Sequence, residues 1–248
     1  MRRLVDAREH LDGGLDDTAT LDGNLADLAR INRIFGGTRL SIAAFRRLIG
    51  AAAGPAAISG AGSETGAAAL RVIDVGTGAA DIPIALAAAN GPWSSVIVTA
   101  VDSRPEILAA AERVNPMLRS HPTVSLALAD GRALPWPDGA FDVGHASLVL
   151  HHLERLEAVA FLAELRRVAR LGVVINDLAR GRLTLLGARV ILNVMTRNAW
   201  TRQDGVLSVR RAWTRSEAEE LLREAGLRPI GAAVGVAGHR WAIAAVPA

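Results

Sequence analysis

The chain has 248 residues, of which 50% are hydrophobic and 21% are charged, and its formal net charge is +3. This composition fits one large folded domain, or a domain with an appendage, and excludes disordered and fibrous classes. The chain contains no cysteine, which excludes disulfides, thiolate metal sites and cysteine nucleophiles. All the basic side chains apart from histidine are arginine, and the small net charge does not predict a nucleic-acid surface.

The N-terminal stretch "MRRLVDAREHLDGG" carries charges every few positions and has no apolar centre, so it does not resemble a secretory signal. No run of 18 apolar residues is present; the nearest, Leu183–Met195, is interrupted by Arg189. We therefore expect a soluble, cytoplasmic protein without membrane insertion.

The first part of the chain predicts helices. Residues 1–50 place apolar side chains at helical spacing, which indicates an N-terminal helical cap. Residues 51–69 are rich in small residues and predict a linker. Residues 70–248 then form the main domain.

In that domain, short apolar runs alternate with helical patterns. Strands are predicted at 71–75, 96–102, 123–130, 141–150 and 171–178, and helices at 81–90, 104–114, 153–170 and 216–226. This alternation predicts an α/β fold with a parallel sheet and helices on both faces. The C-terminal stretch 227–246 reads as two strands around Gly235–Gly238, which predicts an antiparallel hairpin.

Residues 179–212 fit neither one strand nor one plain helix, and we interpret them as an insertion over the mouth of the sheet. Their apolar part, Leu183–Met195, is left open between a substrate lid, a dimer surface and a core helix.

Ligands of an open parallel sheet bind beyond the carboxyl ends of its strands. The residues predicted at those ends are Asp74, Gly76, Thr77, Gly78, Asp81, Asp102, Ser103, Asp130, Gly131, Asn176 and Asp177. This rim is acidic. Asp81 stands where a dinucleotide fold has its third glycine, and its charge would repel a pyrophosphate. A phosphate-free, positively charged nucleoside fits better, and S-adenosylmethionine has that chemistry.

Three segments carry a resemblance to a known family. "VIDVGTGAADIP", "AVDSRPEIL" and "ALADGRALPWPDGAFDVGHASLVLHHL" resemble, in order and spacing, the motifs of class I S-adenosylmethionine-dependent methyltransferases. "INDLARGRL" and "LARINRIFGG" are also similar to a bacterial small-molecule subgroup that tailors polyketide-type phenolic products. The resemblance implies a Rossmann-like, seven-stranded mixed sheet that ends in an antiparallel hairpin.

The resemblance also implies roles for single residues. Gly76 and Gly78, with Thr77 between them, would let the backbone approach the methionine part of the cofactor. Asp74 would face its amino group, Asp102 would accept from the ribose hydroxyls, and Ser103 would lie near the adenine. The remaining cofactor-binding residues would be Asp81, Asp130, Gly131, Arg132, Ala146 and Ser147. Ala79 would replace a glycine that is common in this loop.

His151 and His152 follow the fourth predicted strand, where the family places residues beside the transferred methyl group. Either could act as a general base, or could only shape the pocket. Asn176 and Asp177 are candidates for contact with the substrate. The histidines lack metal-ligand spacing in the sequence, so we predict no metal site.

The expected function is methyl transfer from S-adenosylmethionine to a small, apolar or aromatic acceptor, on oxygen or carbon, with S-adenosylhomocysteine as product. The expected partner is this small molecule and not a nucleic acid, and a homodimer is left open. The alternatives are a catalytically silent S-adenosylmethionine-binding or regulatory protein and an RNA methyltransferase. A nicotinamide oxidoreductase is disfavoured by Asp81 and by the C-terminal hairpin.

Overall fold

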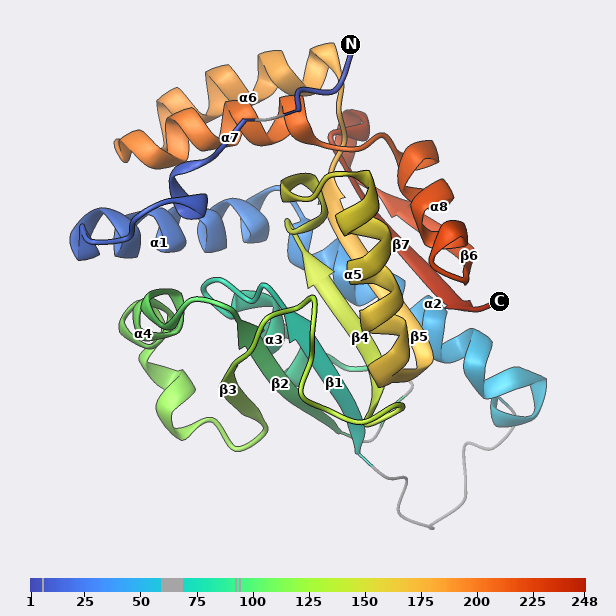
Figure 1. Cartoon of the computed structure of the whole chain (residues 1–248). Coiled ribbons are helices and arrows are strands. Elements are labelled where there is room, and N and C mark those ends of the chain that lie inside the picture. The colour runs from blue at the N-terminus through green and yellow to red at the C-terminus, as the bar shows by residue number, and fades with distance from the viewer. Residues whose placement is uncertain (6, 59–68, 92, 94) are drawn as a thin grey trace.

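A computed structural model of the chain describes residues 1–5, 7–58, 69–91, 93 and 95–248. At its centre is a seven-stranded sheet in the order β3-β2-β1-β4-β5-β7-β6 (Figure 1). The strands are β1 (Leu70–Val75), β2 (Val96–Asp102), β3 (Val124–Leu128), β4 (Phe141–Ser147), β5 (Ala169–Leu178), β6 (Leu227–Val234) and β7 (Arg240–Pro247). Strands β1 to β5 pair in parallel, whereas β7 is antiparallel to both β5 and β6. The predicted mixed sheet with a C-terminal hairpin is confirmed.

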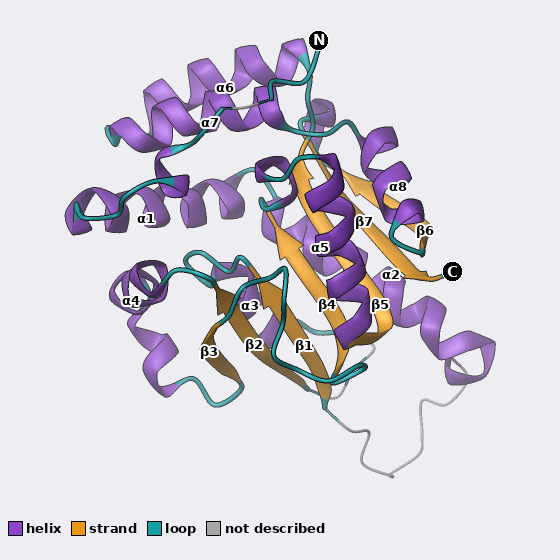
Figure 2. Ribbon diagram, viewed as in Figure 1, coloured by secondary structure: helices purple, strands orange, loops and turns teal. Residues whose placement is uncertain are grey.

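Helices cover both faces of this sheet, as Figure 2 shows. The helices are α1 (Thr18–Ile34), α2 (Gly37–Ile58), α3 (Asp81–Ala87), α4 (Pro105–Val114), α5 (Arg155–Val168), α6 (Arg182–Met195), α7 (Ala199–Arg211) and α8 (Arg215–Glu224). Short 3₁₀ turns are η1 (His10–Asp12), η2 (Pro116–Ser120), η3 (Leu150–His152) and η4 (Val236–Gly238). Helices α5 and α8 pack on one face around Leu162 and Leu221, and α2 and α3 pack on the other around Phe45 and Leu86.

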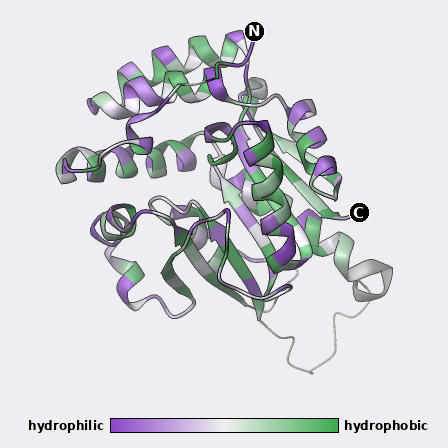
Figure 3. Cartoon of the chain, in the orientation of Figure 1, coloured by the Kyte–Doolittle hydropathy of each residue, from purple (hydrophilic) through white to green (hydrophobic). Residues whose placement is uncertain are grey.

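The central strands are hydrophobic because both of their faces are covered. In β4, the residues from Phe141 to Ala146 are all buried. Figure 3 shows hydrophobic residues along the strands and a mixture of hydrophobic and hydrophilic residues on the surrounding helices. Within the described part of the chain, no helix combines the length and the apolar character needed to cross a membrane.

Three helices lie beyond the carboxyl ends of the parallel strands, where they enclose the space above the sheet. These are α1, from the N-terminal region, and the antiparallel pair α6 and α7 from the segment 179–212 (Figure 1). Helix α2 departs from the predicted cap, because Phe45 and Leu48 bury it against the sheet. This helix also continues to Ile58, into the stretch predicted as a linker. Residues 59–68 of that linker lie outside the described residues.

The apolar stretch Leu183–Met195 is not a core helix. Of the residues of α6, only Leu192 is buried, whereas Leu183, Leu186, Val190 and Val194 are exposed. The inner side of α6 instead lines a cavity. Of the three alternatives left open for this segment, the core helix does not fit, because four of its apolar side chains are exposed.

Candidate functional site

A glycine turn after β1 forms the floor of a first cavity. Gly76 and Gly78 have φ angles of +73° and +54°, which glycine adopts without steric cost. A Cβ atom on Gly76 would lie 2.3 Å from Val149 Cγ2. The amides of Gly76 and Thr77 donate to the carbonyl oxygen of Val101 at 2.8 and 2.9 Å, which fixes the turn against the end of β2.

The third residue with a positive φ angle in this turn is Ala80, not Ala79. Ala80 begins α3 from a left-handed conformation (φ 53°, ψ 26°) and is fully buried. Ala79 has no such conformation and packs against Leu21 and Leu25 of α1. The replaced glycine that we predicted at position 79 therefore belongs at position 80, where a Cβ atom is strained.

Three carboxylates line this cavity, those of Asp12, Asp81 and Asp102. Asp102, at the end of β2, accepts from the amides of Gly78 (3.4 Å) and Arg104 (3.2 Å), and burial raises the pKa of its carboxyl. Asp81, in the first turn of α3, accepts from Asn32 Nδ2 at 3.3 Å, and burial raises its pKa as well. The cavity has a volume of about 240 Å³. Its lining includes Gly76, Thr77, Gly78, Asp81, Asp102, Ser103, Arg104, Ser147, Leu148, Val149 and His152.

Five residues that we predicted to contact the cofactor lie elsewhere. Asp74 is buried behind the turn and is hydrogen-bonded to His145. Asp130 and Arg132 form a surface ion pair, with exposed side-chain fractions of 47% and 64%. Gly131 packs against the core, where a Cβ atom would lie 2.7 Å from Val75 Cγ1, and Ala146 is buried in the core around α5. None of these five residues lines the first cavity, and their contacts with the cofactor stay predictions.

A second, larger cavity of about 540 Å³ adjoins the first. Its walls are mostly apolar and come from α1, α6, α7 and η4, with Ile31, Phe35, Leu183, Ile191, Val209 and Val236 among the lining residues. The two cavities share Leu11, Leu28, Asn32, Leu148 and His152 in their linings. At this junction Leu148 has a left-handed backbone (φ 60°), a strained conformation that is typical of functional sites.

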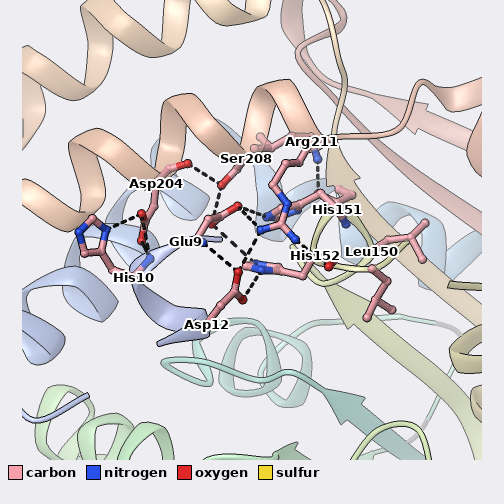
Figure 4. A network of polar contacts seen from close by, with 12 residues as sticks. Glu9, His10, Asp12, Leu150, His151, His152, Asp204, Ser208 and Arg211 are labelled. Carbon is pink, nitrogen blue, oxygen red and sulfur yellow. Dashed lines mark hydrogen bonds and ion pairs between the residues drawn. The ribbon is translucent and has the colours of Figure 1, made fainter. Parts of the chain in front are cut away.

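Figure 4 shows a polar network at the wall of the larger cavity, in which side chains from the N-terminal segment, η3 and α7 point toward one another. His151 is buried, and its Nδ1 lies 2.7 Å from Asp177 Oδ1. The centroid of the His152 ring lies 4.3 Å from that of His151, with the two rings tilted by 34°, and His152 Nδ1 lies 2.9 Å from Asp12 Oδ1. Burial raises the pKa of Glu9, whose carboxylate lies within 4 Å of both rings, to about 7.

Asn176 and Asp177, which we predicted to contact the substrate, lie behind the cavity walls. Both are fully buried, and neither lines the two cavities. Asp177 orients His151 by accepting from both its ring and its amide. Burial opposes its ionisation, but the charge and hydrogen bond of His151 keep the pKa of Asp177 below the usual range.

Asn176 belongs to a buried chain of hydrogen bonds around Arg240. Arg240 donates to Asn176 Oδ1 (2.6 Å), Asn32 Oδ1 (2.6 Å) and Ser147 Oγ (2.8 Å). Because Asn32 in turn contacts Asp81, this chain connects β5 to the first cavity. Sequence reasoning missed Arg240 and Asn32, as it missed Glu9 and Asp12, because no motif surrounds these residues and only the fold brings them to the site.

The glycine turn after β1, the carboxylate after β2 and the reversed C-terminal hairpin together define a class I, Rossmann-like methyltransferase fold. Residues 72–172 match the family described as "Methyltransferase domain". The chain therefore carries an S-adenosylmethionine-dependent methyltransferase domain, as the motifs predicted.

Solved structures share the fold. A SAM-dependent methyltransferase from Aquifex aeolicus is 22% identical, with coverage of 72% of this chain and 82% of that one and a TM-score of 0.53. Magnesium protoporphyrin IX methyltransferase from Synechocystis PCC 6803, with bound SAH, is 17% identical (81% and 82% coverage, TM-score 0.53). An O-methyltransferase family 2 protein from Planctomyces limnophilus in complex with apigenin is 17% identical (75% and 52%, TM-score 0.55). This chain thus spans about half of the last protein. No curated protein sequence matches the chain.

The residues of the first cavity fit the cofactor, S-adenosylmethionine. Gly76 leaves its backbone exposed at the floor of the cavity, because it has no side chain. The carboxylate of Asp102 can accept hydrogen bonds from hydroxyl groups, and the negative charge of Asp81 suits a cationic group. The Thr77 hydroxyl is buried at the same cavity and has no hydrogen-bond partner among the described residues. The cavity therefore offers both charge and unused hydrogen-bonding capacity to a nucleoside ligand.

Proposed function

We propose that the enzyme methylates a hydroxyl group of a small, largely apolar molecule that binds in the larger cavity. The observation that supports this most directly is the junction at His152, the one polar side chain of the Glu9–His151–His152 group that lines both cavities. An acceptor in the apolar cavity would place its reactive group there, next to the cofactor. Several neighbours in fold are O-methyltransferases of small molecules by their titles, which supports the same class of acceptor.

In this proposal the first cavity holds the cofactor. Asp102 would bind the ribose hydroxyls, Asp81 would face a cationic group, and the Gly76–Gly78 turn would contact the methionine part. Bound S-adenosylmethionine supplies a methyl group already activated by its sulfonium. The protein's contribution is then to align the acceptor, exclude water and accept the proton that the hydroxyl group loses. Helix α1 lines both cavities, and α6 and α7 line the larger one, so these helices would exclude water from the acceptor.

The charge distribution of the larger cavity supports a small molecule over RNA. Among its lining residues the arginines are Arg39 and Arg240, and Arg240 is buried in the hydrogen-bond chain around Asn176. An RNA-binding mouth would need a continuous band of cations that contact phosphates.

The test is transfer of labelled methyl groups from S-adenosylmethionine to a panel of phenols, naphthols and hydroxyquinones, with total RNA as a parallel substrate. We expect product with hydroxylated aromatics. In His152→Gln the rate should fall at least about 100-fold while S-adenosylhomocysteine affinity changes little, because the histidine acts on the acceptor.

His121→Gln is the matched control, because His121 lies outside both cavities, and it should retain the full rate. Labelled RNA with no small-molecule product would overturn the proposal. Tight cofactor binding without transfer to any member of the panel would favour the catalytically silent alternative.

A further inference from the structure

Three potential metal ligands converge at the wall of the larger cavity (Figure 4). His151 Nε2 lies 3.7 Å from Glu9 Oε1, and His152 Nε2 lies 3.8 Å from Glu9 Oε2. These separations are too long for hydrogen bonds. Two ligand atoms bound at ~2.1 Å to one tetrahedral ion lie about 3.4 Å apart. One potential ligand atom from each of the three residues lies within 4.8 Å of the others, so a modest movement of these side chains would complete such a site.

The Nδ1 atoms of both histidines contact carboxylates, as is usual for histidines that bind a metal through Nε2. His151 Nδ1 lies 2.7 Å from Asp177, and His152 Nδ1 lies 2.9 Å from Asp12. A carboxylate accepts hydrogen bonds, so each Nδ1 donates one, and Nε2 is the ring atom of each histidine that remains for a metal. Carboxylate–histidine pairs of this kind orient the ligands of metal sites.

Glu9 supplies an independent observation. Its side chain is only 3% exposed, and Oε2 accepts from Ser208 Oγ at 2.9 Å. Its Oε1 is buried and has no hydrogen-bond partner among the described residues. A buried carboxylate oxygen without a hydrogen bond is costly, and a metal ion between Oε1 and the two imidazoles would satisfy it.

The charged side chains around the two rings also favour a bound cation. Three carboxylates contact or approach the rings, those of Glu9, Asp12 and Asp177. In the described structure the guanidinium group nearest to this cluster is that of Arg211, 2.9 Å from Asp12 Oδ2 and 3.7 Å from Glu9 Oε1.

We propose that Glu9, His151 and His152 bind a divalent first-row transition-metal ion, with Zn²⁺ as the reference ion. Two imidazoles and one carboxylate suit such ions better than Mg²⁺ or Ca²⁺. Three protein ligands leave coordination positions open, and these face the larger cavity. This inference deepens the proposed function, because the ion would hold the acceptor oxygen at the junction. The sequence predicted no metal here, since Glu9 lies far from the histidines along the chain.

The test is metal binding to the untagged full-length chain after treatment with a chelator, without cofactor or acceptor. Titration with Co²⁺ should show one equivalent bound with visible d–d absorption, and Zn²⁺ should displace it. Glu9→Gln and His152→Gln should abolish the absorption. Asp12→Asn keeps all three ligands and should weaken binding by about 10- to 100-fold.

Matched controls are Glu112→Gln, an exposed glutamate, and His121→Gln, and both should bind as the unmodified chain does. Circular dichroism identifies variants that do not fold. If the ligand variants do not fold, the Co²⁺ affinity of Asp12→Asn is compared with that of the unmodified chain. Absence of Co²⁺ and Zn²⁺ binding, or binding that Glu9→Gln and Asp12→Asn leave unchanged, would overturn the metal site.

The two proposals can fail separately. Methyl transfer that continues at full rate in metal-free protein would overturn the metal's role and leave the proposed function intact. One equivalent of bound Co²⁺ that depends on Glu9, without transfer to any hydroxylated acceptor, would support the site and count against the function.

Discussion

Asp74 and His145 lie opposite each other in the paired strands β1 and β4, and their side chains are joined at 2.5 Å between Oδ1 and Nδ1. The other ring nitrogen of His145 lies 2.9 Å from Ser41 Oγ in α2. All three side chains are buried. Asp74 thus connects two strands and a helix behind the glycine turn, instead of facing the cofactor.

The first prediction follows from this contact. Asp74→Asn keeps the shape of the side chain but removes the charge that strengthens the buried hydrogen bond. We expect the free energy of unfolding to fall by about 1–3 kcal/mol, with little change in S-adenosylhomocysteine affinity. Urea unfolding and calorimetric titration measure the two quantities. An affinity loss of tenfold or more at unchanged stability would instead assign Asp74 a direct contact with the cofactor.

The second prediction concerns the close approach of Gly76 to Val149. In Gly76→Ala the new Cβ would meet Val149 Cγ2 at 2.3 Å, on a backbone with positive φ. We expect about 1–3 kcal/mol of destabilisation and a cofactor affinity at least about tenfold weaker. Gly187→Ala in α6 is the control, because its Cβ would meet no atom within 4 Å. Equal cofactor affinities in the two variants would contradict the role of this turn.

The main elements of the fold could be predicted from the sequence because each depends on local patterning. Apolar strands, helix periodicity and the two adjacent C-terminal strands are visible without knowledge of the tertiary structure. The end of α2 could not be predicted, because packing of Phe45 and Leu48 against the sheet supports the helix into a stretch of small residues. For the same reason the sequence did not show that α2 covers the sheet instead of the site.

The candidate site was predictable only where its residues follow strand ends. Asp102 is the last residue of β2, and Asp81 begins α3 after the glycine turn that follows β1. The structure places both at the first cavity. Asp74 was misplaced because it lies inside β1, where alternate side chains point to opposite faces of the sheet. Glu9 carries no local signal at all, since its only link to His151 is made by the folding of the N-terminal segment against α7 and η3.

The third prediction distinguishes the two alanines of the glycine turn. Ala80 has φ 53°, a conformation that costs a residue with a Cβ atom about 1–2 kcal/mol. Ala80→Gly relieves this strain but also makes the unfolded chain more flexible, which lowers stability. The net effect should be an increase of about 0.5–1 kcal/mol in the free energy of unfolding. Ala79→Gly should lower it by a similar amount, because no left-handed backbone is relieved there. Chemical unfolding of both variants measures this, and the opposite order would place the strain at residue 79.

The last prediction is a pH dependence of cofactor binding that originates in Asp81. Burial raises the pKa of this carboxyl in the free protein, so part of the population is protonated in mild acid. A cationic ligand favours the carboxylate form and lowers that pKa, so binding releases a proton. Affinity for S-adenosylmethionine should therefore increase as the pH rises above the usual pKa of an aspartate, and level off once Asp81 is ionised in the free protein.

Asp81→Asn should bind more weakly at pH 7, with a flatter profile, because Asp102 is then the only carboxylate lining the cavity whose pKa lies above its usual range. Calorimetry in buffers of different ionisation enthalpy measures both the affinity and the released proton, and an unchanged profile in Asp81→Asn would exclude this carboxylate as the origin.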